Sequence, residues 1–137
     1  MRFHPWRRLR ALRNVDLTWA RMDGVLGATD GVCRIVMHPD QSQAQRRCTL
    51  AHELAHVELG HTGPVDAHDE RATSQLAARW LITLEQLLDA LRWADDLPTV
   101  ADELWVDEPT LLARLDGLTD AERAALMVLW QEVERGC

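Results

Sequence analysis

The spacing of apolar residues changes once along this chain, near Pro39, and that change limits the possible folds more than any other feature. Before Pro39, short apolar runs are separated by Asp23-Gly24 and Asp30-Gly31, a dipeptide typical of tight turns between paired strands. After it, apolar residues recur every three or four positions, as they do in amphipathic helices. The sequence therefore predicts an α+β fold, with a small sheet first and a helical bundle after it.

The expected elements follow from this division. An N-terminal helix is predicted at residues 5–13, because Pro5 suits a first helical turn and apolar residues follow at helical spacing. The two Asp-Gly turns predict that the strands pair as a three-stranded antiparallel sheet. The predicted strands are residues 15–22, 25–28 and 32–38. The predicted helices are residues 41–60, 67–81, 84–94, 99–105 and 107–115, with a last helix from residue 119.

Length and charge limit the classes of protein that this chain can be. Its 137 residues, 47% hydrophobic and 27% charged, suffice for one compact domain and are atypical of disordered or fibrous chains. Residues 1–50 carry nine arginines and four aspartates, whereas residues 51–137 carry six arginines and eighteen acidic residues. An acidic C-terminal part repels nucleic-acid phosphates, so we do not expect direct nucleic-acid binding there.

Nothing in the sequence suggests a membrane segment or an exported, disulfide-bonded protein. The apolar runs fall far short of the roughly 20 residues that span a bilayer, and arginines interrupt the N-terminal apolar residues, unlike in a secretory signal peptide. The chain has three cysteines, Cys33, Cys48 and Cys137, and none of them forms a C-x-x-C pair. This spacing disfavours a disulfide framework and a thiolate zinc site. We expect a cytoplasmic protein without a membrane partner.

The segment His52-Glu53-Leu54-Ala55-His56 lies in the first long predicted helix and carries the clearest chemical signal. Residues four apart share one helix face, so both imidazoles can reach one cation. Glu53 lies about 100° around the same turn, where its carboxylate can approach a water molecule beside the metal. This H-E-x-x-H spacing is that of zinc peptidases, so it predicts Zn²⁺ at His52 and His56, with Glu53 as the catalytic base.

A third metal ligand is expected from the start of the next predicted helix, which offers Asp66, His68, Asp69 and Glu70. Glu70 is the favoured candidate, because it shares a stripe with Thr73 that can face the first helix. Asp69 is its main competitor, although its shorter side chain points about 100° away on the same helix. His61 is a further alternative, one residue before the position of the third metzincin histidine. That position is Thr62, which excludes the metzincin class.

Together these residues resemble the ImmA/IrrE family of metallopeptidases. The matching segments are His4-Pro5-Trp6, residues 48–56, Gly60-His61, Glu70-Arg71 and residues 76–82. The family comprises bacterial and phage zincins, often encoded beside an Xre-type repressor that they inactivate by cleavage. The resemblance implies a zinc endopeptidase with Glu70 as third ligand and such a repressor as protein substrate. Leu76 and Thr83 replace the usual Phe and Pro of the family, and neither touches the predicted metal shell.

The resemblance also implies how the chain is divided and how it holds a substrate. It covers about residues 5–82, which predicts a zincin-like core at residues 1–82. An acidic helical subdomain is then expected at residues 83–137, packed with the core as one domain. The family fold implies that the edge of the sheet holds an extended peptide by strand addition.

Peptide hydrolysis needs a further group, a donor that stabilises the oxyanion of the tetrahedral intermediate. The chain contains no tyrosine, a residue that many zincins use for this purpose. The candidates are therefore His61, His68, His38 and Arg71. The sequence does not choose among these four residues.

Two other functions stay open at this level. The motif can bind a metal without turnover, so the chain could be a non-catalytic regulator that acts by protein contact. Residues 100–115 have the apolar spacing of a helix-turn-helix, which is a DNA-binding motif. However, Trp105 stands where the turn usually has Gly, and the second helix is acidic, so we expect a protein contact there instead. The oligomeric state is left open.

Overall fold

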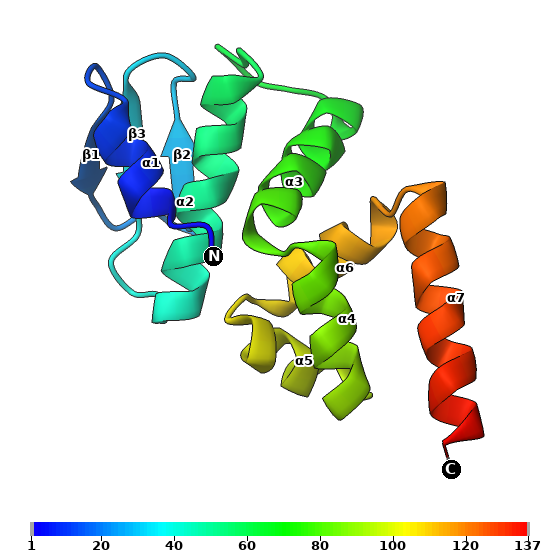
Figure 1. Ribbon diagram of the computed structural model, residues 1–137. Coiled ribbons are helices and arrows are strands. Elements are labelled where there is room, and N and C mark those ends of the chain that lie inside the picture. The colour runs from blue at the N-terminus through cyan, green and yellow to red at the C-terminus, as the bar shows by residue number, and fades with distance from the viewer. Residues whose placement is uncertain (1, 137) are drawn as a thin grey trace.

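The computed structural model describes residues 2–136 and confirms the α+β class (Figure 1). Cys137, one of the three thiols named above, lies outside the described residues. The strands are β1 (Asp16–Trp19), β2 (Gly27–Thr29) and β3 (Arg34–Met37). The helices are α1 (Pro5–Ala11), α2 (Gln43–Glu58), α3 (Ala67–Leu81), α4 (Leu84–Trp93), α5 (Leu97–Leu104), α6 (Glu108–Asp116) and α7 (Asp120–Arg135).

The sheet differs from the prediction in how its strands pair. Its order is β1-β3-β2, so β3 lies in the middle. β1 runs parallel to β3, with Leu17 opposite Ile35, whereas β2 runs antiparallel to β3. The sheet is therefore mixed, and both the predicted hairpin at Asp23-Gly24 and the all-antiparallel pairing are wrong.

Burial explains this arrangement. The side chains of Ile35 and Met37 on β3 are fully buried, and only a middle strand has neighbours along both of its edges. The chain reaches the far edge from β1 through residues 20–26, a connection too long for the two-residue turn that Asp23-Gly24 predicts. A local turn signal was therefore overridden by the burial of the most apolar strand.

The second predicted turn, at Asp30-Gly31, does join two antiparallel strands. Asp30 Oδ1 accepts hydrogen bonds from the backbone N–H groups of residues 32–34, at 2.8, 2.9 and 3.1 Å. These bonds lower the pKa of the Asp30 carboxyl to about 2. Gly31 has a φ of +76°, and a Cβ atom there would lie 1.7 Å from the carbonyl oxygen of His61. The turn between β2 and β3 is thus packed directly on the loop that follows α2.

Helix α2 lies between the sheet and helices α3 to α7, whereas α1 lies on the sheet side (Figure 1). It begins with a capping box, in which the Ser42 hydroxyl accepts from the Gln45 N–H and the Gln45 side chain accepts from the Ser42 N–H. Leu50 and Leu54 pack against β3. Other α2 residues belong to a second apolar core, whose buried members are Cys48, Ala51, Ala55, Ala77, Leu81, Ile82, Leu87, Ala90, Val100, Ala101, Leu104, Val106 and Leu111. Two cores therefore hold α2 in place.

Helix α6 packs against α3, and one buried ion pair joins α6 to α7. Arg114 of α6 is only 3% exposed, donates to the carbonyl oxygen of Ile82, and pairs with Glu122 in the first turn of α7. Beyond this pair, α7 runs beside α4, where Leu129 is buried and Arg92 of α4 pairs with Glu132 at 3.8 Å. Within residues 2–136, no helix combines the length and the apolar character needed to cross a membrane.

Candidate metal centre

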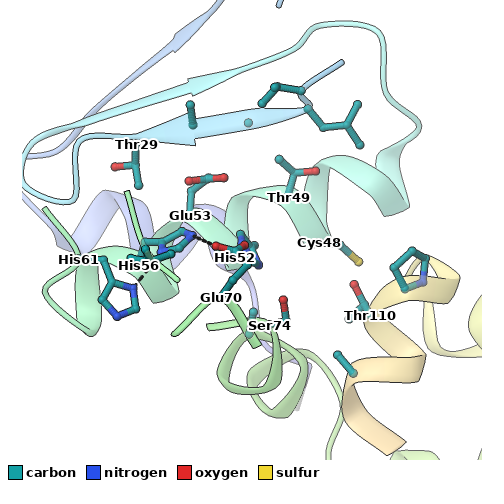
Figure 2. Close-up of a pocket in the computed structure, with 18 of the residues that line it drawn as sticks. Thr29, Cys48, Thr49, His52, Glu53, His56, His61, Glu70, Ser74 and Thr110 are labelled. Atoms are coloured by element: carbon teal, nitrogen blue, oxygen red, sulfur yellow. Dashed lines mark hydrogen bonds and ion pairs between the residues drawn. The ribbon is translucent and has the colours of Figure 1, made fainter. Parts of the chain in front are cut away.

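Helices α2 and α3 bring together three side chains that could hold a metal ion (Figure 2). His52 Nε2 lies 2.5 Å from Glu70 Oε1, and His56 Nε2 lies 3.3 Å from Glu70 Oε2. One donor atom of each residue lies within 4.8 Å of the other two. The structure thus places side by side the three residues that the sequence predicts as metal ligands.

The local structure explains why these groups meet. The two histidines are one turn apart on α2, with ring centroids 4.8 Å apart and ring planes at 85°. Asp66 caps α3 by accepting from the Asp69 N–H at 2.8 Å, which sets the start of that helix. Glu70 then falls in the first turn of α3, the helix that packs most extensively against α2. The third ligand is therefore positioned by a helix cap and a helix–helix contact.

Glu53 lies beside the three donors but is not one of them. Its side chain sits between α2 and the sheet (Figure 2), and the residue is only 6% exposed. Burial, together with the negative charge of Glu70, raises the pKa of its carboxyl to about 7. A Cβ atom at Gly27 of β2 would lie 3.2 Å from Glu53 Oε1. The carboxylate therefore has room because β2 carries a glycine at its closest approach.

His61 lies against His56 and is not one of the three donors that cluster together. Gly60 has a φ of +73°, and the chain turns back so that the His61 N–H donates to the carbonyl oxygen of His56 at 3.0 Å. The Nδ1 atoms of His56 and His61 lie 3.0 Å apart, and Thr73 Oγ1 lies 3.3 Å from the same His61 atom. His61 thus lies against Nδ1 of His56, the ring nitrogen that does not face Glu70, and orients that imidazole.

The other candidates from the sequence lie outside the donor cluster. The Arg71 guanidinium is paired with Asp116 of α6, with 2.9 Å between Nε and Oδ2. His68 is exposed, and His38 Nδ1 accepts from the Asp40 N–H at 3.0 Å. Asp69, the competitor for third ligand, contributes backbone contacts to the α3 cap and to Thr73. None of His38, His68, Asp69 and Arg71 is among the described residues that line the cleft.

The three donors open into a cleft of about 660 Å³. Residues 24–29, which include β2, form its upper wall in Figure 2, and α2 forms its floor. Gly63, Pro64 and Val65 border it near His61. The opposite end is closed by α6, through Pro109, Thr110 and Ala113.

The contribution of α6 to the cleft was not foreseen from the sequence. Thr110 and Ala113 are separated from the H-E-x-x-H motif by more than fifty residues, and no local pattern links them to it. Their acidic neighbours suggested a protein-contact surface. In the structure, Asp116 is paired with Arg71 and Gln75 of α3, which holds α6 against the metal-binding helices.

The family model for the IrrE N-terminal-like domain, Peptidase_M78, matches residues 18–116. The chain belongs to this family. The ImmA/IrrE resemblance is therefore confirmed, and a metallopeptidase-type function is supported. No curated protein and no solved structure was found to match the chain.

The IrrE-like match extends through α6, past residue 82, where the core was expected to end. The predicted boundary between residues 82 and 83 stays a prediction. The donor set fits the zinc that this peptidase family uses, because two imidazole nitrogens and one carboxylate are a common catalytic zinc set. Both histidines present Nε2 to Glu70, so their nitrogens converge on one point.

Proposed function

We propose that this IrrE-like chain is a zinc-dependent endopeptidase that cleaves, and thereby inactivates, a transcriptional repressor. The observation that carries the proposal is the convergence of His52, His56 and Glu70 beside a buried carboxylate at the bottom of a cleft. Membership of a peptidase family supports a hydrolytic reaction over simple metal storage.

Three residues would hold the ion, through Nε2 of His52, Nε2 of His56 and the carboxylate of Glu70. Zinc in such a site supplies Lewis acidity toward a peptide carbonyl and makes water a better nucleophile at neutral pH. His61 keeps the His56 ring in orientation from the side away from Glu70. The ligand set is therefore supported by a neighbouring side chain as well as by the two helices.

Glu53 is the residue that moves the proton. It lies next to His52 in the chain and lines the cleft, so one of its oxygens can face a water molecule that attacks the substrate. Glu53 accepts the proton of this water and then delivers it to the nitrogen of the leaving amine. Its burial between α2 and β2 limits its side-chain motion between the two transfers.

The β2 strand provides a place for an extended peptide. β2 pairs with β3 along one edge only, and it forms the wall of the cleft opposite α3 and α6. A peptide can therefore add to its free edge through main-chain hydrogen bonds, a general way to hold a substrate without fixing its sequence. An extended peptide held there passes over Glu53, because Gly27 of β2 lies above that side chain.

An Xre-type repressor is the proposed substrate, and its cleavage places the reaction in the cytoplasm. The support for this substrate is the resemblance of the motif and its flanking segments to the ImmA/IrrE family. DNA binding by the helix-turn-helix-like region is disfavoured, because Arg114 is buried in an ion pair with Glu122 and is not free to contact phosphates.

The test combines zinc content with cleavage of unfolded casein and of an Xre-type repressor. We expect Glu53→Gln to keep its zinc and to lower the cleavage rate by about 10²–10⁴-fold. The matched control is Glu58→Gln, an exposed residue at the end of the same helix, which should cleave at the wild-type rate.

The ligand assignment is tested on the neighbouring pair in α3. Glu70→Ala should lose most of its zinc, whereas Asp69→Ala should keep it. Near-stoichiometric zinc in the Glu70 variant would remove the third ligand. Zinc binding by the wild type without cleavage of either substrate would instead favour a non-catalytic regulator.

A further inference from the structure

The middle of α7 is apolar on every side. Residues 124–130 read Ala-Ala-Leu-Met-Val-Leu-Trp, without a polar side chain over about two helical turns. A helix segment that is apolar all round is normally buried all round. Here Leu129 is buried, whereas Met127, Val128 and Trp130 are 59%, 55% and 64% exposed. The chain itself therefore covers one side of this segment and leaves a large apolar surface in contact with solvent.

The covered side of α7 faces α4. Leu129 is buried there, and Glu132 pairs with Arg92 of α4 at 3.8 Å. Met127 lies about 160° around the helix from Leu129, so it points away from α4. Figure 1 shows α7 at the side of the molecule opposite the sheet, and no α7 residue among the described ones lines the cleft. The open face of α7 is therefore separate from the metal centre.

Four exposed residues form a stripe along this open face. Arg123, Met127, Trp130 and Glu134 are spaced by four, three and four positions, which places their side chains on one side of the helix. We call these four residues the α7 stripe. It begins with a cation, has two large apolar side chains in the middle and ends with a carboxylate. Within residues 2–136 neither Arg123 nor Glu134 has an ion-pair partner, and Glu134 accepts only from the Trp130 indole N–H, at 2.8 Å.

The α7 stripe is complementary to itself when two copies run in opposite directions. With the two-fold axis between residues 128 and 129, Arg123 of one copy faces Glu134 of the other, and Met127 faces Trp130. Symmetry makes each of these contacts twice. A thioether against an aromatic ring is a favourable contact in addition to the apolar area that it buries. A parallel copy would instead bring Arg123 against Arg123 and Glu134 against Glu134, so the charges select the antiparallel arrangement.

We infer that a second copy of this chain covers the open face of α7, as an antiparallel helix pair across the α7 stripe. The inference goes beyond the proposed peptidase function and does not depend on it, because pairing uses no residue of the metal centre. One helix face per copy makes a small interface, so we expect a weak, reversible dimer with a dissociation constant of about 10–100 µM. In dilute solution the monomer predominates.

The first experiment measures self-association by sedimentation equilibrium at about 1–300 µM protein, in reducing buffer so that no disulfide links two chains. Wild type should pass from monomer to dimer over this range. Trp130→Ser should raise the dissociation constant at least about tenfold, because it removes both Met–Trp contacts of the symmetric pair. The matched control is Trp93→Ser, an 81% exposed tryptophan at the end of α4 and outside the stripe, which should keep the wild-type constant. A wild type that stays monomeric up to about 300 µM would overturn the inference.

The second experiment tests the direction of pairing by exchanging charges. Arg123→Glu alone, or Glu134→Arg alone, should weaken the dimer about fivefold or more, since each places like charges opposite each other at two symmetric positions. The double variant Arg123→Glu/Glu134→Arg should return to within about threefold of wild type, because the opposite charges then face each other again. Far-ultraviolet circular dichroism and zinc content, equal in all variants, check that each chain is folded.

Failure of the double variant to restore association would overturn the antiparallel pairing, and so would a Trp130→Ser protein that still dimerises like wild type. The readout is mass in solution, so its outcome is distinguishable from that of the cleavage assays. A dimer without peptidase activity would support this inference while refuting the proposed function.

Discussion

Helices α2 and α7 have the same length and the same kind of N-terminal cap, but α2 is largely buried and α7 is largely exposed. Both have sixteen residues, and both begin with a complete capping box, Ser42 with Gln45 and Thr119 with Glu122. Seven residues of α2 are buried, whereas Leu129 is the one buried residue of α7. The capping residues therefore specify that a helix forms and where it starts, but they do not decide whether the helix is buried in the core and carries a functional site.

The environment of α2 makes it the centre of the molecule. It is packed on one side against the sheet and on the other against α3, and it carries both histidines. In contrast, α7 exposes apolar side chains along much of its length, namely Met127, Val128, Trp130 and Val133. The difference predicts that substitutions of similar size have very different costs in the two helices.

The largest expected effect is in the core of α2. Leu50→Ala should lower the free energy of unfolding by about 2–5 kcal/mol, because its fully buried side chain fills the space against β3. Met127→Ala on α7, where the side chain is 59% exposed, should change it by less than about 0.5 kcal/mol. Urea unfolding of the dilute, monomeric protein measures both. A similar cost for the two variants would show that the exposed face of α7 is packed within its own chain, and the comparison would then fail.

A smaller effect is expected at the anchor of α7. The Arg114 guanidinium holds the pKa of the Glu122 carboxyl at about 2, below its usual value of 4.5. Since the folded-state pKa is the lower one, the pair stabilises the protein above about pH 4.5, and this stability is lost as the pH falls toward 2.

Glu122→Gln tests this linkage. The variant should lose about 1–3 kcal/mol of stability at pH 7, because the buried Arg114 keeps only a neutral partner. Below pH 4.5 its stability should fall less steeply with pH than that of the wild type. Unfolding midpoints measured from pH 7 to pH 2.5 give both values. Parallel curves for the two proteins would show that the ion pair contributes nothing.

The smallest expected effect is one that the two helices should share. Ser42→Ala and Thr119→Ala each remove a side chain that accepts from the backbone of the first turn. Each should cost about 1 kcal/mol, since a cap acts within one turn and both sites are exposed. Equal costs, measured by urea unfolding, would confirm that the local designs are equivalent. A far larger cost at Ser42 would mean that the burial of α2 amplifies its cap.

The helices could be predicted from the sequence because their signals are local. The start of α4 follows from Thr83 and Gln86, and α3 has the residues 67–81 that the apolar spacing predicts. The approach of His52 to His56 could be predicted for the same reason, since it needs only one turn of α2. The approach of Glu70 also needs the packing of α3 against α2, and it was predicted from the acidic start of the next helix and from the family resemblance.

Strand pairing and the far wall of the cleft could not be predicted. The Asp23-Gly24 dipeptide predicts only a local turn. The pairing of β1 with β3 depends instead on the burial of Ile35 and Met37, which come more than ten residues later in the chain. The position of Ala113 in the cleft depends on contacts of α6 with α3, which lie far apart in sequence. Contacts between residues so far apart in the sequence produce no recurring pattern of apolar residues from which they could be predicted.

The close approach at Gly31 places the turn between β2 and β3 directly against the loop that carries His61. Since a single missing methyl group separates the β2–β3 turn from the carbonyl of His61, the two backbones have no room to slide past each other. A force that displaces the free edge of the sheet must also displace the loop whose imidazole lies against His56. The turn between β2 and β3 therefore shares its packing with the loop that holds the His56 ring.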